Sequence, residues 1–199
     1  MSMIGTSVAR IEDPELLTVG GKYVDDLAPA DALHITFVRS VMPHASLSLI
    51  DTSDAEAHPD CVAVFTAESL ALTADPPKYG MLNRDMKRSA LANGVVRYVG
   101  EPIVAVVSNS REGGVDAAEG VVIEYEELPL VLRPADSLAD DAFVVFPEAD
   151  TNVAFHIPAK EPEAQFISGA EITLELEFRN HRMAPAPMEP RAAISKWET

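Results

Sequence analysis

RYVGEPIVAVVSNSREGGVDAAEGVVIEYEELP, residues 97–129, is the stretch that decides the fold of this chain. Its apolar run at residues 103–107 lacks polar alternation, which is typical of a strand that is buried on both faces. An alanine-rich segment at residues 111–120 follows this run, and a second β-rich run occupies residues 121–125. The sequence therefore predicts a strand, a helix that covers it, and a further strand.

Three glycines weaken the predicted helix at residues 111–120. Gly113, Gly114 and Gly120 each cost ~1 kcal/mol relative to alanine in a helix interior. The sequence alone leaves open whether Gly113 and Gly114 mark a local bulge or a degenerating gene.

Upstream of this stretch, the pattern predicts more strands and one short helix. Thr52 is the expected cap of that helix, and Pro59 is its stop. The connection between the first two strands is either a hairpin or a crossover, and the sequence does not decide between them. The expected strands are residues 20–26, 33–40, 46–51 and 61–66, and the expected helix is residues 53–57.

Residues 73–89 show neither a helical nor a strand period. They contain Pro76, Pro77 and Gly80 together with four basic residues. Structureless loops of more than ~12 to 15 residues in a compact domain are usually functional lids or interfaces, or they are disordered. The sequence gives equal weight to a contact surface and to disorder for this loop.

Residues 171–179 alternate strictly between apolar and polar side chains. Such alternation predicts a strand with one dry and one wet face, and residues 191–197 are its candidate antiparallel neighbour. A two-stranded ribbon is marginal alone, because at least three strands or a covering helix are needed to bury its apolar face. The apolar side chains in question are Ile172, Leu174, Leu176 and Phe178.

The composition is that of a globular protein with a strong acidic excess. The chain has 199 residues, of which 47% are hydrophobic and 24% are charged, and its formal net charge is −17. This charge argues against nucleic acid and anionic membranes as partners, because phosphate binding requires clustered Lys and Arg. No apolar stretch approaches the ~20 residues that span a bilayer, and no secretory leader is recognisable at the first ten residues. The sequence therefore predicts a cytoplasmic protein.

The single cysteine, Cys61, excludes an internal disulfide and a four-cysteine cluster within these residues. Cys61 precedes the apolar residues of a predicted core strand, which favours a buried, inert thiol over a nucleophile. Pro59 argues against a helical metal pair with His58. The five histidines are scattered without metal-ligand spacing and are expected to be structural: His34, His44, His58, His156 and His181.

Familiar site motifs are incomplete in this sequence. Gly20, Gly21 and Lys22 fall short of a phosphate loop, and residues 99–102 precede a strand where a dinucleotide site needs a helix. The serines lack the G-x-S-x-G context, and the clustered carboxylates lack the pattern of a calcium loop. The sequence therefore assigns no catalytic, cofactor-binding or metal-ligating residue.

Several separated, ordered motifs carry a family resemblance. They are GGKYVDD (20–26), LHITFVRS (33–40), HAS (44–46), VAVFTAESL (62–70), residues 97–129 and HRMAPAPMEPRAA (181–193). Together they resemble the α/β hammerhead region of the large subunit of the molybdenum hydroxylases, which include xanthine dehydrogenase, aldehyde oxidase and aerobic carbon monoxide dehydrogenase. The resemblance implies an α+β fold with a mixed sheet and short covering helices, followed by a β-ribbon that begins the cofactor domain.

The resemblance also implies a division of the chain into an arm at residues 1–17, a hammerhead domain at 18–139, a linker at 140–170 and the truncated start of a molybdopterin-binding domain at 171–199. The segment 181–191 is the one candidate for site chemistry, because in the family it lies at the start of the cofactor-binding half. Glu189 and Arg191 are expected to be structural there, paired or hydrogen-bonded beside stiffening prolines.

In the family, the complete enzyme is an oxidoreductase that hydroxylates an aldehyde or N-heterocycle, or oxidises carbon monoxide. Its chemistry uses a molybdopterin (molybdenum) cofactor, with FAD and 2Fe–2S clusters on other domains or subunits. The family's pterin-contacting loops and catalytic glutamate have no counterpart here, so the resemblance implies that this chain alone binds no cofactor and is a non-catalytic scaffold and interface.

The expected partners are the remainder of the large subunit and the FAD and iron–sulfur subunits, with homo-oligomers through exposed strands also possible. The alternative function is a stand-alone binding or assembly module that keeps the hammerhead fold without catalysis. An independent hydrolase or metal enzyme would require a site that the sequence does not display.

Overall fold

The structure is a computed structural model that describes residues 5, 7–158, 167–181, 183–187, 189 and 191–198. The chain divides into two compact units. One unit is Leu33–Thr173, and the other combines Met1–Ala32 with Leu174–Thr199. The unit Leu33–Thr173 holds every strand in the described part of the chain.

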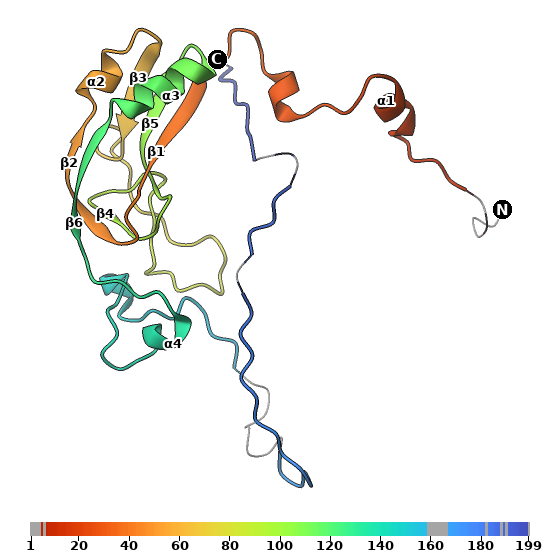
Figure 1. Cartoon of the computed structure of the whole chain (residues 1–199), viewed down its shortest axis with the longest axis vertical. Coiled ribbons are helices and arrows are strands. Elements are labelled where there is room, and N and C mark those ends of the chain that lie inside the picture. Colours follow the sequence, from red (N-terminus) through yellow and green to blue (C-terminus); the bar gives the residue numbers. More distant parts are fainter. Residues whose placement is uncertain are drawn as a thin grey trace. The chain divides into compact units, whose positions relative to one another are not determined.

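Two three-stranded antiparallel sheets build the unit Leu33–Thr173 (Figure 1). The first has the order β1 (His34–Arg39), β5 (Pro102–Ser108), β3 (Cys61–Thr66). The second has the order β4 (Val95–Val96), β2 (Ala45–Asp51), β6 (Val122–Glu127). The helices of this unit are α2 (Ser53–Glu56), α3 (Arg111–Glu119), α4 (Pro134–Ser137) and the 3₁₀ helix η2 (Pro147–Ala149).

Strand β5 is the centre of the core, as its apolar run predicts. It lies between β1 and β3, and helix α3 packs against both β1 and β5. Ile103, Val104 and Val106 have no exposed surface. The strand predicted to be buried on both faces is therefore confirmed.

The expected mixed sheet is wrong, because every strand pair in the described residues is antiparallel. Both neighbours of β5 run antiparallel to it, so no edge of β5 is left for a parallel partner. The chain that leaves β5 through α3 enters β6 in the second sheet. The strand–helix–strand order is confirmed, and the helix connects two sheets.

Four of the other elements upstream of β5 match the prediction, whereas strand β4 and the short helix α1 (Asp13–Thr18) were not predicted. Strands β1, β2 and β3 and helix α2 lie where the sequence places them. Residues 20–26, in contrast, contain the 3₁₀ helix η1 (Val24–Leu27) where a strand was expected. The Asp26 carboxylate accepts a hydrogen bond of 2.8 Å from the Tyr23 N–H, and this local bond favours a turn over a ladder.

Asp51 caps helix α2 in place of the expected Thr52. The Asp51 carboxylate accepts hydrogen bonds from the Ser53 hydroxyl at 2.7 Å and the Ser53 N–H at 3.0 Å. Thr52 occupies the N-cap position, but its hydroxyl donates to the Glu56 carboxylate at 2.7 Å.

The predicted C-terminal ribbon is wrong for this structure, because residues 171–179 and 191–197 contain no strand. The apolar side chains of the first segment are largely exposed, and in the described part of the chain no helix or strand packs on them to stabilise a ribbon. Their exposed fractions are 79% for Ile172, 81% for Leu174, 69% for Leu176 and 84% for Phe178. The unit that combines Met1–Ala32 with Leu174–Thr199 also contains the short helix α1 (Asp13–Thr18).

None of the helices in the described residues combines the length and apolar character that a membrane crossing requires.

Candidate functional site

The loop at residues 73–89 is closed by its own backbone. The N–H of Asp75 donates to the Arg88 carbonyl at 3.0 Å, and the N–H of Arg88 donates to the Asp75 carbonyl at 2.9 Å. The N–H of Asn83 donates to the Ala154 carbonyl at 2.7 Å, and Met86 is buried. These anchors favour the contact-surface interpretation of the loop over disorder.

The tip of this loop exposes apolar and cationic side chains together. The tip is a turn in which the Leu82 N–H donates to the Tyr79 carbonyl at 3.0 Å. Tyr79 and Met81 in this turn are 77% and 68% exposed. The loop has four cations against two carboxylates, whereas the whole chain has 32 acidic and 15 basic residues. The loop's exposed cations are Lys78, Arg84, Lys87 and Arg88.

One cation of the loop is fixed against the segment before β5. The Arg88 guanidinium lies 4.8 Å from the centroid of the Tyr98 ring, within the range of a cation–π contact. The neighbouring Arg97 lies 4.7 Å from the Phe146 ring, and its Nε donates to the Val145 carbonyl at 3.3 Å. No periodic pattern in the sequence predicts these two contacts, because each joins a loop to a loop.

The turn that contains Gly100 and Glu101 is structural. Gly100 adopts a φ of +91°, and its N–H donates to the Ser40 carbonyl at 2.7 Å. Glu101 is buried, and its carboxylate accepts a hydrogen bond from the Arg97 N–H. This turn positions the start of β5.

The described histidines form no site. His44 is buried, its Nδ1 is hydrogen-bonded to the Pro129 carbonyl, and its ring lies 5.2 Å from that of Phe143. The His58 Nδ1 accepts from the Asp60 N–H at 3.3 Å. Across the described ranges, no three His, Cys, Asp or Glu side chains are grouped to hold a metal ion.

Cys61 is a half-buried free thiol at the start of β3. Desolvation raises the pKa of the Cys61 thiol, and the charge of Glu56 also raises it. A raised pKa lowers the thiolate fraction at neutral pH, so the side chain is a poor nucleophile.

The candidate segment 181–191 has one hydrogen bond of note. The Glu189 carboxylate accepts from the Val24 N–H at 3.3 Å, and both residues belong to the same unit. His181 and Arg191 are exposed, and in the part of the chain that the structure describes no ion pair joins Glu189 to Arg191. Arg182, Met188 and Pro190 lie outside the described residues.

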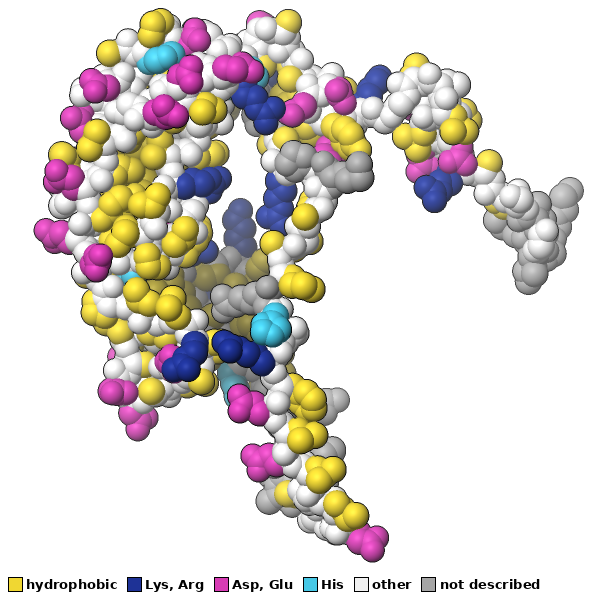
Figure 2. Space-filling model, in the orientation of Figure 1, with side chains coloured by type: hydrophobic (Ala, Val, Ile, Leu, Met, Phe, Trp, Pro, Cys, Tyr) yellow, Lys and Arg dark blue, Asp and Glu magenta, His cyan; other side chains and the backbone are white. Residues whose placement is uncertain are grey.

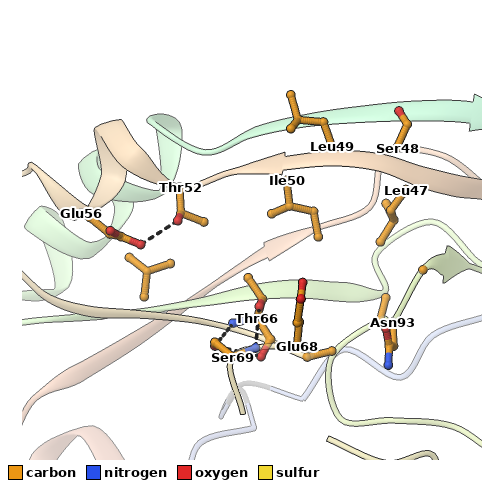
Figure 3. Close-up of a pocket in the computed structure, with 14 residues that line it drawn as sticks. Leu47, Ser48, Leu49, Ile50, Thr52, Glu56, Thr66, Glu68, Ser69 and Asn93 are labelled. Atoms are coloured by element: carbon orange, nitrogen blue, oxygen red, sulfur yellow. Dashed lines mark hydrogen bonds between the residues drawn. The ribbon is translucent and has the colours of Figure 1, made fainter. Parts of the chain in front are cut away.

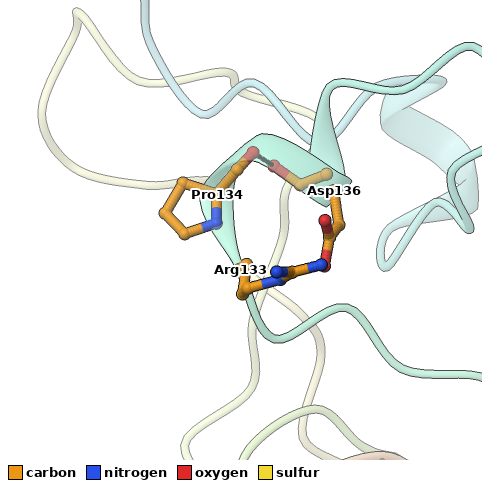
Figure 4. Close-up of polar contacts among 4 residues, drawn as sticks. Arg133, Pro134 and Asp136 are labelled. Carbon is orange, nitrogen blue, oxygen red and sulfur yellow. Dashed lines mark hydrogen bonds and ion pairs between the residues drawn. The ribbon is translucent and has the colours of Figure 1, made fainter. Parts of the chain in front are cut away.

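An ion pair of the described residues lies at the start of helix α4. Arg133 Nε lies 2.8 Å from the Asp136 carboxylate at the start of α4 (Figure 4). The hydrogen bond to Asp136, together with its charge, raises the pKa of Arg133.

Acidic side chains are spread along the edge of the molecule near β2 and β6 (Figure 2). This acidic surface attracts a basic partner and repels an anionic one.

Comparison with protein families identifies one domain. Residues 18–129 match the family described as "Aldehyde oxidase and xanthine dehydrogenase, a/b hammerhead domain". That range covers all six strands and helix α3.

Individual relatives agree with this match. The chain is 36% identical, over 99% of its length, to the nicotine 6-hydroxylase large subunit of Paenarthrobacter nicotinovorans. It is 29% identical, over 98% of its length, to the carbon monoxide dehydrogenase large chain of Afipia carboxidovorans. The crystal structure of quinoline 2-oxidoreductase from Pseudomonas putida 86 superposes with a TM-score of 0.63 and 37% identity over 71% of this chain and 18% of that one. The chain spans about a quarter of the two curated relatives, 24% and 26% of their lengths.

Proposed function

Because the chain belongs to the aldehyde oxidase and xanthine dehydrogenase family, we propose that it serves as a non-catalytic scaffold and interface within the large subunit of a molybdenum hydroxylase. It matches the N-terminal part of large subunits of oxidoreductases in this family. The match of residues 18–129 to the hammerhead domain is the observation that carries the proposal. The proposal includes domain boundaries after residues 17, 139 and 170.

The large-subunit relatives are molybdopterin-dependent dehydrogenases, which implies a molybdenum cofactor in the complete enzyme. The described residues of this chain do not fit that group. The cavity between β2 and β3 is lined by two carboxylates and no cation, so it would repel the phosphate of a pterin. We propose that parts of the large subunit outside this chain hold the cofactor.

The proposed contact surface of this scaffold is the loop at residues 73–89. Its backbone bridge and its buried Met86 hold Tyr79, Met81 and the four cations on the surface. Tyr, Met and Arg side chains are enriched at protein–protein interfaces, and cations at an interface attract carboxylates of the partner. The proposed partners are the remainder of the large subunit and the subunits that carry FAD and 2Fe–2S clusters, in the cytoplasm.

Co-expression with the complementary polypeptide of the large subunit tests this function. We expect the two chains to co-purify, and we expect the double variant Lys78→Glu/Lys87→Glu to weaken their association. A double variant on the exposed face of α3, Glu112→Lys/Glu119→Lys, changes the charge by the same amount outside the loop and should bind as the wild type does. Failure of the wild-type chains to associate would contradict the proposal.

A second candidate is a stand-alone binding module with the hammerhead fold. It is favoured by the closed core of the unit Leu33–Thr173, in which Val96, Ile103 and Val104 have no exposed surface. The exposed side chains of Leu174, Leu176 and Phe178 favour the subunit role instead. A monodisperse chain that does not bind a hydrophobic dye and unfolds in one transition would support the second candidate.

A further inference from the structure

A cavity of about 440 Å³ opens between β2 and β3, strands that belong to different sheets (Figure 3). Strand β4 pairs with β2 only at Ala45 and Ser46, and the Leu47 N–H then donates to the Gly94 carbonyl at 2.8 Å. Beyond Leu47, no described strand continues β4 along β2, and β3 is the edge strand of its own sheet. The cavity therefore lies beside strand edges that have no neighbour.

The floor of the cavity is apolar. Side chains of Leu47 and Ile50 point from β2 into the cavity, Ile50 toward Thr66 and Leu47 toward Asn93 on the opposite wall (Figure 3). Ala67 and Ala92 also line the cavity and are 3% and 6% exposed. Such a floor favours an aliphatic side chain over a charged one.

The rim of the cavity is negative. Glu56 and Glu68 line it, and none of its lining residues is Lys, Arg or His. The Glu56 carboxylate already accepts the Thr52 hydroxyl at 2.7 Å. Glu68 is exposed, its side chain points toward β2, and within the described residues its carboxylate has no hydrogen-bond or ion-pair partner (Figure 3). Glu68 is thus free to receive a cation.

We propose that this cavity binds an extended basic segment of the large subunit that lies outside this chain, with an aliphatic side chain on the floor and a Lys or Arg two residues away on Glu68. The inference rests on the proposed function. Open strand edges accept added strands through main-chain hydrogen bonds, and pockets for alternate side chains then select the sequence. Since the chain spans 24% of its relative, most of the subunit is available to supply the segment.

A pair of short peptides tests the chemistry of the cavity. The full ¹⁵N-labelled chain is titrated with acetyl-Thr-Val-Thr-Lys-Thr-amide and with the same peptide carrying Glu in place of Lys. The lysine peptide should shift the amides of Ser48, Ile50, Ser69 and Asn93, and the glutamate peptide should not. Glu68→Gln should weaken binding about fivefold, as expected for an exposed ion pair. Glu112→Gln, an exposed change on α3, should leave it unchanged.

Three outcomes of this titration would overturn the proposal. They are the absence of shifts at the cavity, equal shifts with the two peptides, and reproduction of the shifts by isopentylamine at the same concentration. The last result would assign the cavity to small amines instead of a peptide strand.

The complex of the two polypeptides separates this inference from the proposed function. Glu68→Lys should weaken the association about tenfold, because it replaces an attraction with a repulsion. If the wild-type chains associate and Glu68→Lys has no effect, the inference fails while the proposed function stands. If the wild-type chains do not associate, the proposed function fails, and the assignment of the segment to the large subunit fails with it.

Discussion

Gly114 of helix α3 lies so close to Ser108 of β5 that a Cβ atom on the glycine would overlap the serine hydroxyl. The same Cβ would lie 2.7 Å from the Thr36 hydroxyl on β1, and a Cβ on Gly113 would overlap the Asp60 side chain. Helix α3 is continuous through both glycines. The glycines therefore reflect close packing of the helix on the sheet, and the bulge considered for residues 113–114 is absent.

This packing makes Gly114→Ala destabilising. A Cβ on Gly114 would meet two hydroxyl oxygens, so the overpacking cost lies near the upper end of its range, ~3 kcal/mol. The better helix propensity of alanine returns ~1 kcal/mol, so we expect a net loss of ~2 kcal/mol in the free energy of unfolding. Urea denaturation measures it. Gly80→Ala is the control, because a Cβ there meets nothing within 4 Å. A Gly114→Ala variant as stable as the wild type would disprove the close approach.

Cys61 should react slowly with alkylating reagents. Desolvation raises the pKa of its thiol, so the thiolate fraction at a given pH is lower than in the unfolded chain. The rate of iodoacetamide modification should therefore reach half of its maximum at a higher pH in the native chain than in urea. The opposite order would identify an activated thiol.

Asp51 should make helix α2 sensitive to acid. The Ser53 hydroxyl, and then the Ser53 N–H, lower the pKa of the Asp51 carboxyl. Its contribution to stability is thus present above the unfolded pKa of about 3.9 and is lost as the pH falls through the lower folded pKa. Asp51→Asn should flatten this part of the pH–stability curve, and Asp31→Asn, in an exposed turn, should not.

Salt should weaken the association that the loop at residues 73–89 mediates. Screening shortens the range of its four cations to about 10 Å at 0.1 M salt and about 3 Å at 1 M. We expect the dissociation constant of the complex to rise with sodium chloride concentration, and to rise less steeply for Lys78→Glu/Lys87→Glu. Equal slopes for the two proteins would exclude the loop from the interface.

The sequence predicts the elements whose signal is local. The apolar run of β5 and the strands β1, β2 and β3 follow from periodicity and composition, and so does helix α3 despite its glycines. The pairing of strands does not follow from such signals, which is why a mixed sheet was expected where two antiparallel sheets form. Residues 171–179 have a strand pattern but lack a covering partner, so their pattern alone does not produce a strand.

The sites depend on contacts between residues that are distant in sequence. The loop at residues 73–89 is held by the backbone bridge of Asp75 and Arg88, which no side-chain pattern encodes. The cavity brings Ile50, Thr66 and Asn93 together from three segments. The absence of catalytic motifs, in contrast, is visible in the sequence, because each motif has a fixed local spacing.

The metal content and turnover of the chain, alone and with the complementary polypeptide, test the central claim most directly. We predict that the chain alone binds no molybdenum and turns over no aldehyde, N-heterocycle or carbon monoxide, and that the assembled complex contains molybdenum and oxidises one of these substrates. Molybdenum-dependent turnover by the chain alone would contradict a scaffold role, and so would a molybdenum-loaded, active enzyme that assembles without this chain.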